Sequence, residues 1–177
     1  TRFKCDWSSD VCSSDLIVAA LMGLSYYFYD QSRDAKNAKG WDQLAQINKL
    51  PEAERWDKFK KVAEDFSGVP VGQYAASTLG DYYFDEAKKA SEANPKVPST
   101  QAPLAVEWYG KALSYSKLNA NEKGLLLINR GEAQELAQKW DEALTDYLEA
   151  AKIGFEGKPL ALLRQARIYE FKKETAK

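Results

Sequence analysis

From Arg33 to the end of the chain, the sequence repeats one pattern, in which an amphipathic stretch of about 13 to 20 residues is followed by a short break. Apolar residues recur at the period of an α-helix, and no stretch keeps the alternation of a β-strand. Pro51 opens one stretch, "SGVPVG" separates it from the next, and "NPKVPSTQAP" is the longest loop. Asn119 and Glu122 have the spacing of a capping box. The sequence therefore predicts an all-α fold of about seven helices in antiparallel pairs.

Two of these stretches are similar to each other. "AVEWYGKAL" and "ALTDYLEAA" share the pattern A-x3-Y-x2-A, and the helices that lead each pair align at Gly80 and Gly131. Small side chains at such positions let two helices approach closely, whereas Tyr147 is expected to fill the space toward the next pair. The residues expected to make these contacts are Gly80, Tyr83, Ala105, Tyr109, Ala112, Gly131, Ala143, Tyr147 and Ala150.

The twelve-residue offset from Gly131 to Ala143, followed by Tyr147, resembles the tetratricopeptide repeat, a helix-turn-helix unit of 34 residues. The resemblance is most specific in "GEAQELAQKWDEALTDYLEAA". It implies that residues 33–177 form an α-solenoid, because each unit leaves one face uncovered and must stack on its neighbours. The expected units are 41–66, 74–116 and 123–155, and residues 160–173 are expected to form a capping helix or half of a further unit.

The sequence departs from the repeat in two ways. Arg130 and Gln134 stand where the repeat usually has Leu and Tyr. The segment between Gly80 and Ala105 is about 13 residues longer than the repeat allows. These departures affect the register of the units but not the helical class.

The resemblance also implies a binding surface, because in this family the leading helix of each unit lines a concave groove that holds peptides or partner helices. The positions that match are Tyr74, Ser77, Asp81, Phe84, Leu125, Ile128, Glu132 and Glu135. Their aromatic, aliphatic and acidic side chains suit a segment that carries basic residues. Leu125 and Ile128 are equally compatible with the core.

An apolar, uncharged run, "LIVAALMGLSYYFY", covers residues 16–29. It is shorter than the roughly 20 residues that span a bilayer, although residues upstream could complete it. Its closing aromatic cluster suits a membrane interface. A single-pass anchor at residues 16–32 is one interpretation; a cleaved signal peptide and a soluble core helix are the others. With an anchor, the chain resembles single-pass, periplasm-facing tetratricopeptide proteins, and this resemblance implies a location in the bacterial inner membrane with the repeat domain in the periplasm.

The first fifteen residues contain both cysteines, Cys5 and Cys12, among Ser and Asp. Asp6 to Asp15 resemble the in-frame translation of a sequencing adapter, so residues 1–15 are interpreted as a non-native scar. The chain has 25 Lys and Arg against 26 Asp and Glu, and removing this segment, with two basic and three acidic residues, makes the two counts equal. Such a balance argues against nucleic-acid binding.

After the scar the chain contains no Cys and no His. This excludes thiol nucleophiles, Ser–His pairs, thiolate metal sites and imidazole acid–base chemistry. Trp56-Asp57 and Trp140-Asp141 fit packing at helix starts better than an aromatic ligand platform. Asp81 and Asp85, one turn apart, fit a solvated face better than a cation site. We therefore expect no catalytic, metal or cofactor site.

Two functions rank above an enzyme, which would have to work with carboxylates, Lys, Tyr or Ser only and for which no motif places such groups together. The first is a non-enzymatic scaffold, anchored in the membrane, that binds peptides or partner proteins at the cell envelope, by analogy in secretion or envelope assembly. The second is an oligomerisation module whose helical array packs on sister chains and buries "LGDYYF".

Overall fold

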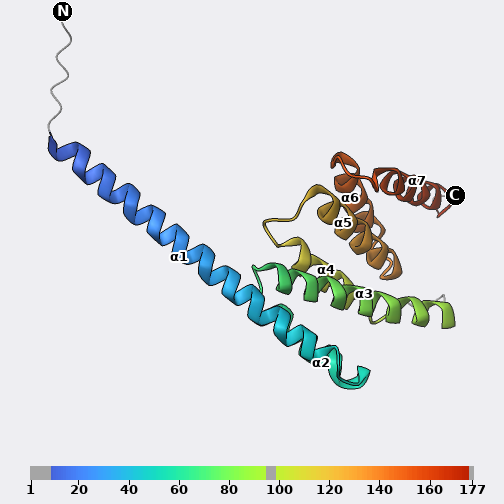
Figure 1. The fold of residues 1–177 in the computed structure, drawn as a ribbon. Coiled ribbons are helices and arrows are strands. Elements are labelled where there is room, and N and C mark those ends of the chain that lie inside the picture. Colours follow the sequence, from blue (N-terminus) through green and yellow to red (C-terminus); the bar gives the residue numbers. More distant parts are fainter. Residues whose placement is uncertain (1–8, 95–98, 176–177) are drawn as a thin grey trace, which may run out of the picture.

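A computed structural model describes the backbone of residues 9–94 and 99–175, and side-chain environments within 16–94 and 99–173. These residues form seven α-helices and no strand, so the all-α prediction is confirmed for the described part of the chain. The helices are α1 (Ser9–Ile47), α2 (Glu52–Asp65), α3 (Pro70–Ala93), α4 (Ala102–Leu113), α5 (Ala120–Leu136), α6 (Trp140–Lys152) and α7 (Lys158–Thr175). Each helix from α2 onward packs against its neighbours in the sequence, and α1 extends from this body as a long arm (Figure 1).

The helix ends follow local signals. The predicted capping box at α5 is confirmed, because Asn119 Oδ1 accepts from the Glu122 backbone N–H and Glu122 accepts from the Asn119 N–H, both at 2.9 Å. The expected start of the next helix after "SGVPVG" is wrong, since α3 already begins at Pro70. Proline fits the first helical turn, where its missing N–H costs nothing. The Val71 N–H in the same turn donates to Asn37 Oδ1 of α1, at 2.9 Å.

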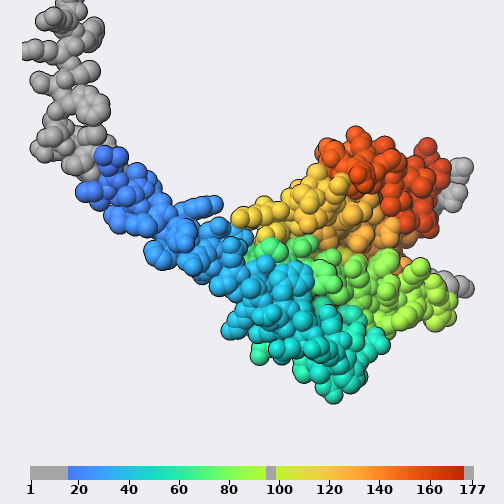
Figure 2. Space-filling model, viewed as in Figure 1, coloured from blue at the N-terminus to red at the C-terminus, as the bar shows by residue number. Residues whose placement is uncertain are grey.

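α1 is one continuous helix of 39 residues that crosses the expected boundary between residues 32 and 33 without a break. Its apolar part is uncovered, with Leu16 67% and Tyr29 62% exposed, whereas Leu44 and Ile47 near its end are buried. Figure 2 shows the apolar part of α1 from residue 16 onward as an arm separate from the body. Residues 1–8 of the expected scar lie outside the described residues, and residues 9–15 belong to α1.

Among the described residues, no helix is both long enough and apolar enough to cross a bilayer.

Two clusters of buried side chains form the core. The first joins the end of α1 to α2, α3, α4 and one side of α5, and includes Leu79 and Trp108. The second joins the other side of α5 to α6 and α7, and includes Leu127 and Ile168. Leu113 packs against both clusters, so the core extends along the succession of helices.

Candidate binding groove

Close contact between α3 and α4 depends on Gly80. A Cβ built on Gly80 would stand 2.5 Å from Cδ1 of Tyr109, a distance that real Cβ atoms do not reach. Tyr109, Ala105 and Ala112 of α4 are at most 1% exposed. The glycine therefore leaves room for a buried ring directly against the backbone of α3.

The same contact recurs between α5 and α6. A Cβ on Gly131 would stand 2.5 Å from Cε1 of Tyr147, and Ala143, Tyr147 and Ala150 are fully buried. The ring of Tyr147 covers Gly131 of its own pair, and Tyr147 belongs to the same core cluster as Ala161 and Ile168 of α7. The Tyr147 carbonyl also accepts from Gln165 Nε2 of α7 at 2.8 Å. The expectation that Tyr147 fills the space toward the next pair stays a prediction.

Eight of the nine expected packing residues are buried, and the ninth, Tyr83, is partly buried against the first cluster.

Both buried tyrosines end at a carboxylate on the helix that they pack against. The Tyr109 hydroxyl donates to Asp81 at 2.7 Å, and the Tyr147 hydroxyl donates to Glu135 at 2.6 Å. Burial, followed by these hydrogen bonds, raises the pKa of both phenols far above the usual value for tyrosine. The two tyrosines thus fix the position of acidic side chains on α3 and α5.

Two adjoining hollows lie over α3, α5 and α7 on this side of the molecule. One has a volume of about 310 Å³ and the other about 320 Å³, and they share Phe84 and Glu132. We call their combined lining the inner groove. It consists of Asp81, Phe84, Asp85, Lys88, Tyr109, Asn129, Glu132, Glu135, Leu136, Arg164 and Arg167.

The two ends of the inner groove differ in charge. Asp81, Asp85 and Glu132 line the first hollow, and among the described residues no Lys or Arg lines it. Burial raises the pKa of Asp81, the hydrogen bond from Tyr109 opposes this, and the charge of Asp85 adds to it. The second hollow includes Lys88, Arg164 and Arg167, and Arg164 forms an ion pair with Glu132. The groove therefore has an acidic end beside α4 and a mixed-charge end beside α7.

The structure brings four of the eight expected groove residues together in the inner groove: Asp81, Phe84, Glu132 and Glu135. Tyr74 is exposed further along α3, where its ring lies 5.1 Å from that of Trp41 of α1. Ser77 is partly exposed and Leu125 is half exposed.

The prediction that Ile128 lines the groove is wrong. It is 2% exposed and belongs to the second core cluster, so it does not line the groove. Asn129 takes this place instead. The groove-facing side of α5 is therefore displaced by one residue from the predicted positions at this turn.

Sequence reasoning missed several groove residues, namely Asp85, Lys88, Tyr109, Asn129, Leu136, Arg164 and Arg167. The helical period was a usable signal for two of them, because Asp85 comes four residues after Asp81 and Lys88 comes three residues after Asp85. No local signal marks Arg164 and Arg167, whose place depends on how α7 packs.

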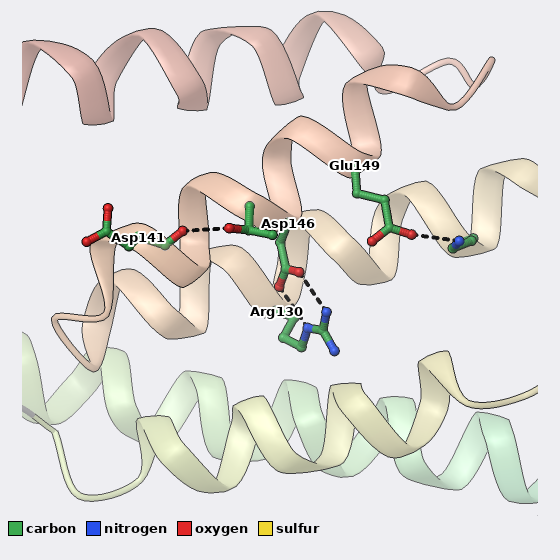
Figure 3. A network of polar contacts seen from close by, with 6 residues as sticks. Arg130, Asp141, Asp146 and Glu149 are labelled. Atoms are coloured by element: carbon green, nitrogen blue, oxygen red, sulfur yellow. Dashed lines mark hydrogen bonds and ion pairs between the residues drawn. The ribbon is translucent and has the colours of Figure 1, made fainter.

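Arg130, which departs from the repeat pattern, bridges α5 and α6. Its Nε and Nη2 donate to the two carboxylate oxygens of Asp146 at 2.7 and 2.6 Å (Figure 3). The side chain of Asp146 is 5% exposed, and this hydrogen bonding raises the pKa of Arg130. A second ion pair, Lys123 with Glu149 at 2.7 Å, joins the same two helices.

The two Trp-Asp pairs lie where helices meet. Trp56 of α2 stacks on Tyr82 of α3, with ring centroids 3.9 Å apart. Trp140 at the start of α6 lies 4.4 Å from Phe171 of α7. Both tryptophans therefore pack between consecutive helices, as expected of residues at inter-helix turns.

The described residues contain no group of three or more Cys, His, Asp and Glu side chains arranged to hold a metal ion.

Comparison with known proteins gave no match: no family model, no curated protein and no solved structure is similar to this chain at a significant level.

Proposed function

We propose that this protein is a non-enzymatic scaffold, built as a tetratricopeptide-type helical array, that binds a segment of a partner protein in the inner groove. The partner segment carries basic residues, because it meets the acidic end formed by Asp81, Asp85 and Glu132. The array is tethered to a bacterial inner membrane by the apolar part of α1, with the groove on the periplasmic side.

The observation that carries the binding proposal is the acidic hollow beside Tyr109. Burial is the main reason why the pKa of Asp81 is raised, and the charge of Asp85 adds to this effect. An arriving Lys or Arg would offset the repulsion between these carboxylates and form a charge-assisted hydrogen bond. Phe84, which lies in both hollows, offers an apolar surface between the two charged ends.

The glycine–tyrosine contacts support the array itself. Gly80 with Tyr109 and Gly131 with Tyr147 are the same contact in two successive helix pairs. Repetition of one contact is what a stacked array of similar hairpins requires.

The arm supports the tether. The side chains of residues 16–29 are exposed on every side of α1, and large apolar surfaces of this kind mark contact with a membrane or a partner. Tyr26 to Tyr29 end the apolar run, where an interfacial aromatic belt is expected.

The binding proposal can be tested with peptides selected from a random display library by the full chain. The affinity of the selected peptides is then measured for three chains. These are the native chain, the groove variant Asp85→Lys and the control variant Glu64→Lys, at an exposed position of α2. We expect enrichment of basic peptides and at least about a tenfold loss of affinity in Asp85→Lys, because charge reversal beside a bound cation costs more than 1.4 kcal/mol. Glu64→Lys should bind normally. Equal selection of acidic and basic peptides, or equal affinities for both variants, contradicts the proposal.

A second candidate function, self-association, is favoured by one observation on α7. Leu162 and Leu163 are 50% and 67% exposed, and Tyr169 is 48% exposed. Such a surface suits a further hairpin or a second copy of the chain. The stretch "LGDYYF" contributes less than expected, because Leu79 and Gly80 are already buried within the chain. Sedimentation of the full chain with and without Leu163→Glu distinguishes the two candidates, since only self-association predicts that this change dissociates an oligomer.

A further inference from the structure

We propose that the bilayer holds the helical body in one fixed orientation, with the α2–α3 turn facing the lipid headgroups. This inference rests on the proposed tether and adds to it the claim that α1 acts as a rigid stalk. The partner at this surface is the phospholipid bilayer, and the contacting part of the body is the turn at Ser67 and Gly68.

The apolar part of α1, residues 16–29, lies outside the body of the protein. Every side chain from Leu16 to Tyr29 is exposed, so nothing in the body covers this part of the helix. A run of that length covers all faces of an α-helix, which suits lipid on every side better than a single protein partner. The run ends at the aromatic residues Tyr26 to Tyr29, and the first charged residue, Asp30, follows directly.

The body contacts α1 from Arg33 onward. Arg33 Nη2 donates to the Gly68 carbonyl at 3.3 Å, and Asn37 Oδ1 accepts from the Val71 N–H at 2.9 Å. Gly40 packs so closely that a Cβ there would stand 2.4 Å from a Val71 methyl carbon. Contacts between α1 and the body therefore start one helical turn after the apolar run and continue to its end.

The distance along α1 from the aromatic residues to the first contacts with the body is short. At 1.5 Å per residue, Arg33 lies about 6 Å beyond Tyr29 and Asn37 about 12 Å beyond it. The headgroup layer on each side of a bilayer is about 5 to 8 Å thick. With the aromatic residues at the interface, the α2–α3 turn therefore lies at or just above the headgroups.

α1 is a stiff connection between the apolar run and the body. Residues 30–39 contain neither Pro nor Gly, and α1 is helical throughout this segment. A continuous helix does not swivel as a flexible linker would. Arg33, Lys36 and Lys39 lie along the same segment, together with Asp30 and Asp34.

The test places one spin label near the proposed lipid surface and one far from it. The full chain, with Cys5→Ser and Cys12→Ser, receives Ser67→Cys in one variant and Glu92→Cys in another. Both positions are exposed, and Glu92 lies about 33 Å along α3 from Pro70. Each variant is reconstituted in phosphatidylethanolamine–phosphatidylglycerol vesicles that contain a nickel-chelating lipid, and the relaxation of the label by headgroup nickel is measured.

We expect relaxation at position 67 to exceed that at position 92 severalfold. Insertion of Gly-Ser-Gly-Ser between Gln31 and Ser32 should reduce this difference, because it uncouples the body from the stalk while leaving both helical parts intact. Circular dichroism of each variant checks that the fold is retained.

The outcomes separate the two claims. If the chain does not float with the vesicles, the tether in the proposed function is wrong. If it floats but both labels relax equally, or if the insertion changes nothing, the tether stands and the fixed orientation is wrong.

Discussion

The ring of Tyr147 lies against the backbone of α5 at Gly131, where a Cβ would stand 2.5 Å from the ring. Tyr109 lies in the same way against Gly80 of α3. Each tyrosine is buried and donates its hydroxyl proton to a carboxylate on the helix that it covers. One residue pair therefore sets the helix spacing within a hairpin and also orients an acidic side chain that lines the inner groove.

Gly131→Ala should lower the free energy of unfolding, although alanine is the better helix former. The added Cβ forces a fully buried ring to move, which costs about 1 to 3 kcal/mol. The gain in helix propensity offsets about 1 kcal/mol of this. Urea denaturation should therefore show a net loss of up to about 2 kcal/mol.

The matched control is Gly110→Ala in α4, where a Cβ meets nothing closer than Arg130 Nη1 at 3.8 Å. This variant should be as stable as the native chain or gain up to about 1 kcal/mol. Equal effects of the two substitutions would mean that Tyr147 does not require the glycine.

Tyr147→Phe should destabilise the protein and also weaken its sensitivity to alkali. Loss of the hydrogen bond to the Glu135 carboxylate costs about 1.5 to 3 kcal/mol near neutral pH. The raised pKa of Tyr147 means that the folded phenol keeps its proton above pH 10, whereas an unfolded tyrosine ionises near pH 10. The native protein should therefore lose stability as the pH rises above about 10, because the unfolded state then binds fewer protons.

Urea denaturation at a series of pH values measures this slope. Tyr147→Phe should show a shallower decline than the native chain, whereas Tyr169→Phe, at an exposed position of α7, should leave the stability near neutral pH unchanged. An unchanged alkaline slope in Tyr147→Phe would contradict the buried hydrogen bond.

Arg130→Ala should cost more stability than the loss of any surface ion pair. It leaves the carboxylate of Asp146, 5% exposed, without its bidentate partner. Breaking a fully buried pair costs about 3 to 5 kcal/mol, and the partial exposure of Arg130 places the expected loss near the lower end.

Replacing both partners, as Arg130→Met with Asp146→Leu, should recover most of the lost stability, because no buried charge remains. The comparison variant is Glu86→Gln, which removes the exposed pair with Lys89 and should cost less than about 1 kcal/mol. Thermal denaturation of the variants ranks the three effects. A small loss in Arg130→Ala, similar to that in Glu86→Gln, would rule out a structural role for this bridge.

Asn37→Ala should loosen the attachment of α1 to the body. The Asn37 side chain of α1 accepts a hydrogen bond from the Val71 N–H in the first turn of α3. The loss of such a cap costs about 1 kcal/mol. Hydrogen exchange should become faster at Val71 in this variant. Gln46→Ala, an exposed position on the same helix, should leave that exchange rate unchanged.

Local patterns predicted much of the fold. The helical period, the breaks and the capping box gave the helices, because each of these signals acts over a few residues. Gly80 and Gly131 could be picked out because the absence of a side chain at a repeated position indicates close packing.

The groove was harder to predict, because it depends on how helices turn relative to one another. Ile128 was assigned to the groove although it points into the second core cluster, since α5 packs against helices on both sides and its apolar residues cover more than one face. Arg164 and Arg167 depend on the position of α7 and could not be inferred from their own segment. The boundary at residue 32 was placed at a change of composition, yet nothing there stops a helix.

The most direct measurement is a map of backbone hydrogen exchange in the full chain, with and without a selected basic peptide. Binding in the inner groove should slow exchange at residues 81–88 of α3 and residues 129–136 of α5, and leave α2 and α6 unchanged. Protection confined to α2 and α6, or no protection at a saturating peptide concentration, would contradict a groove formed by α3, α5 and α7.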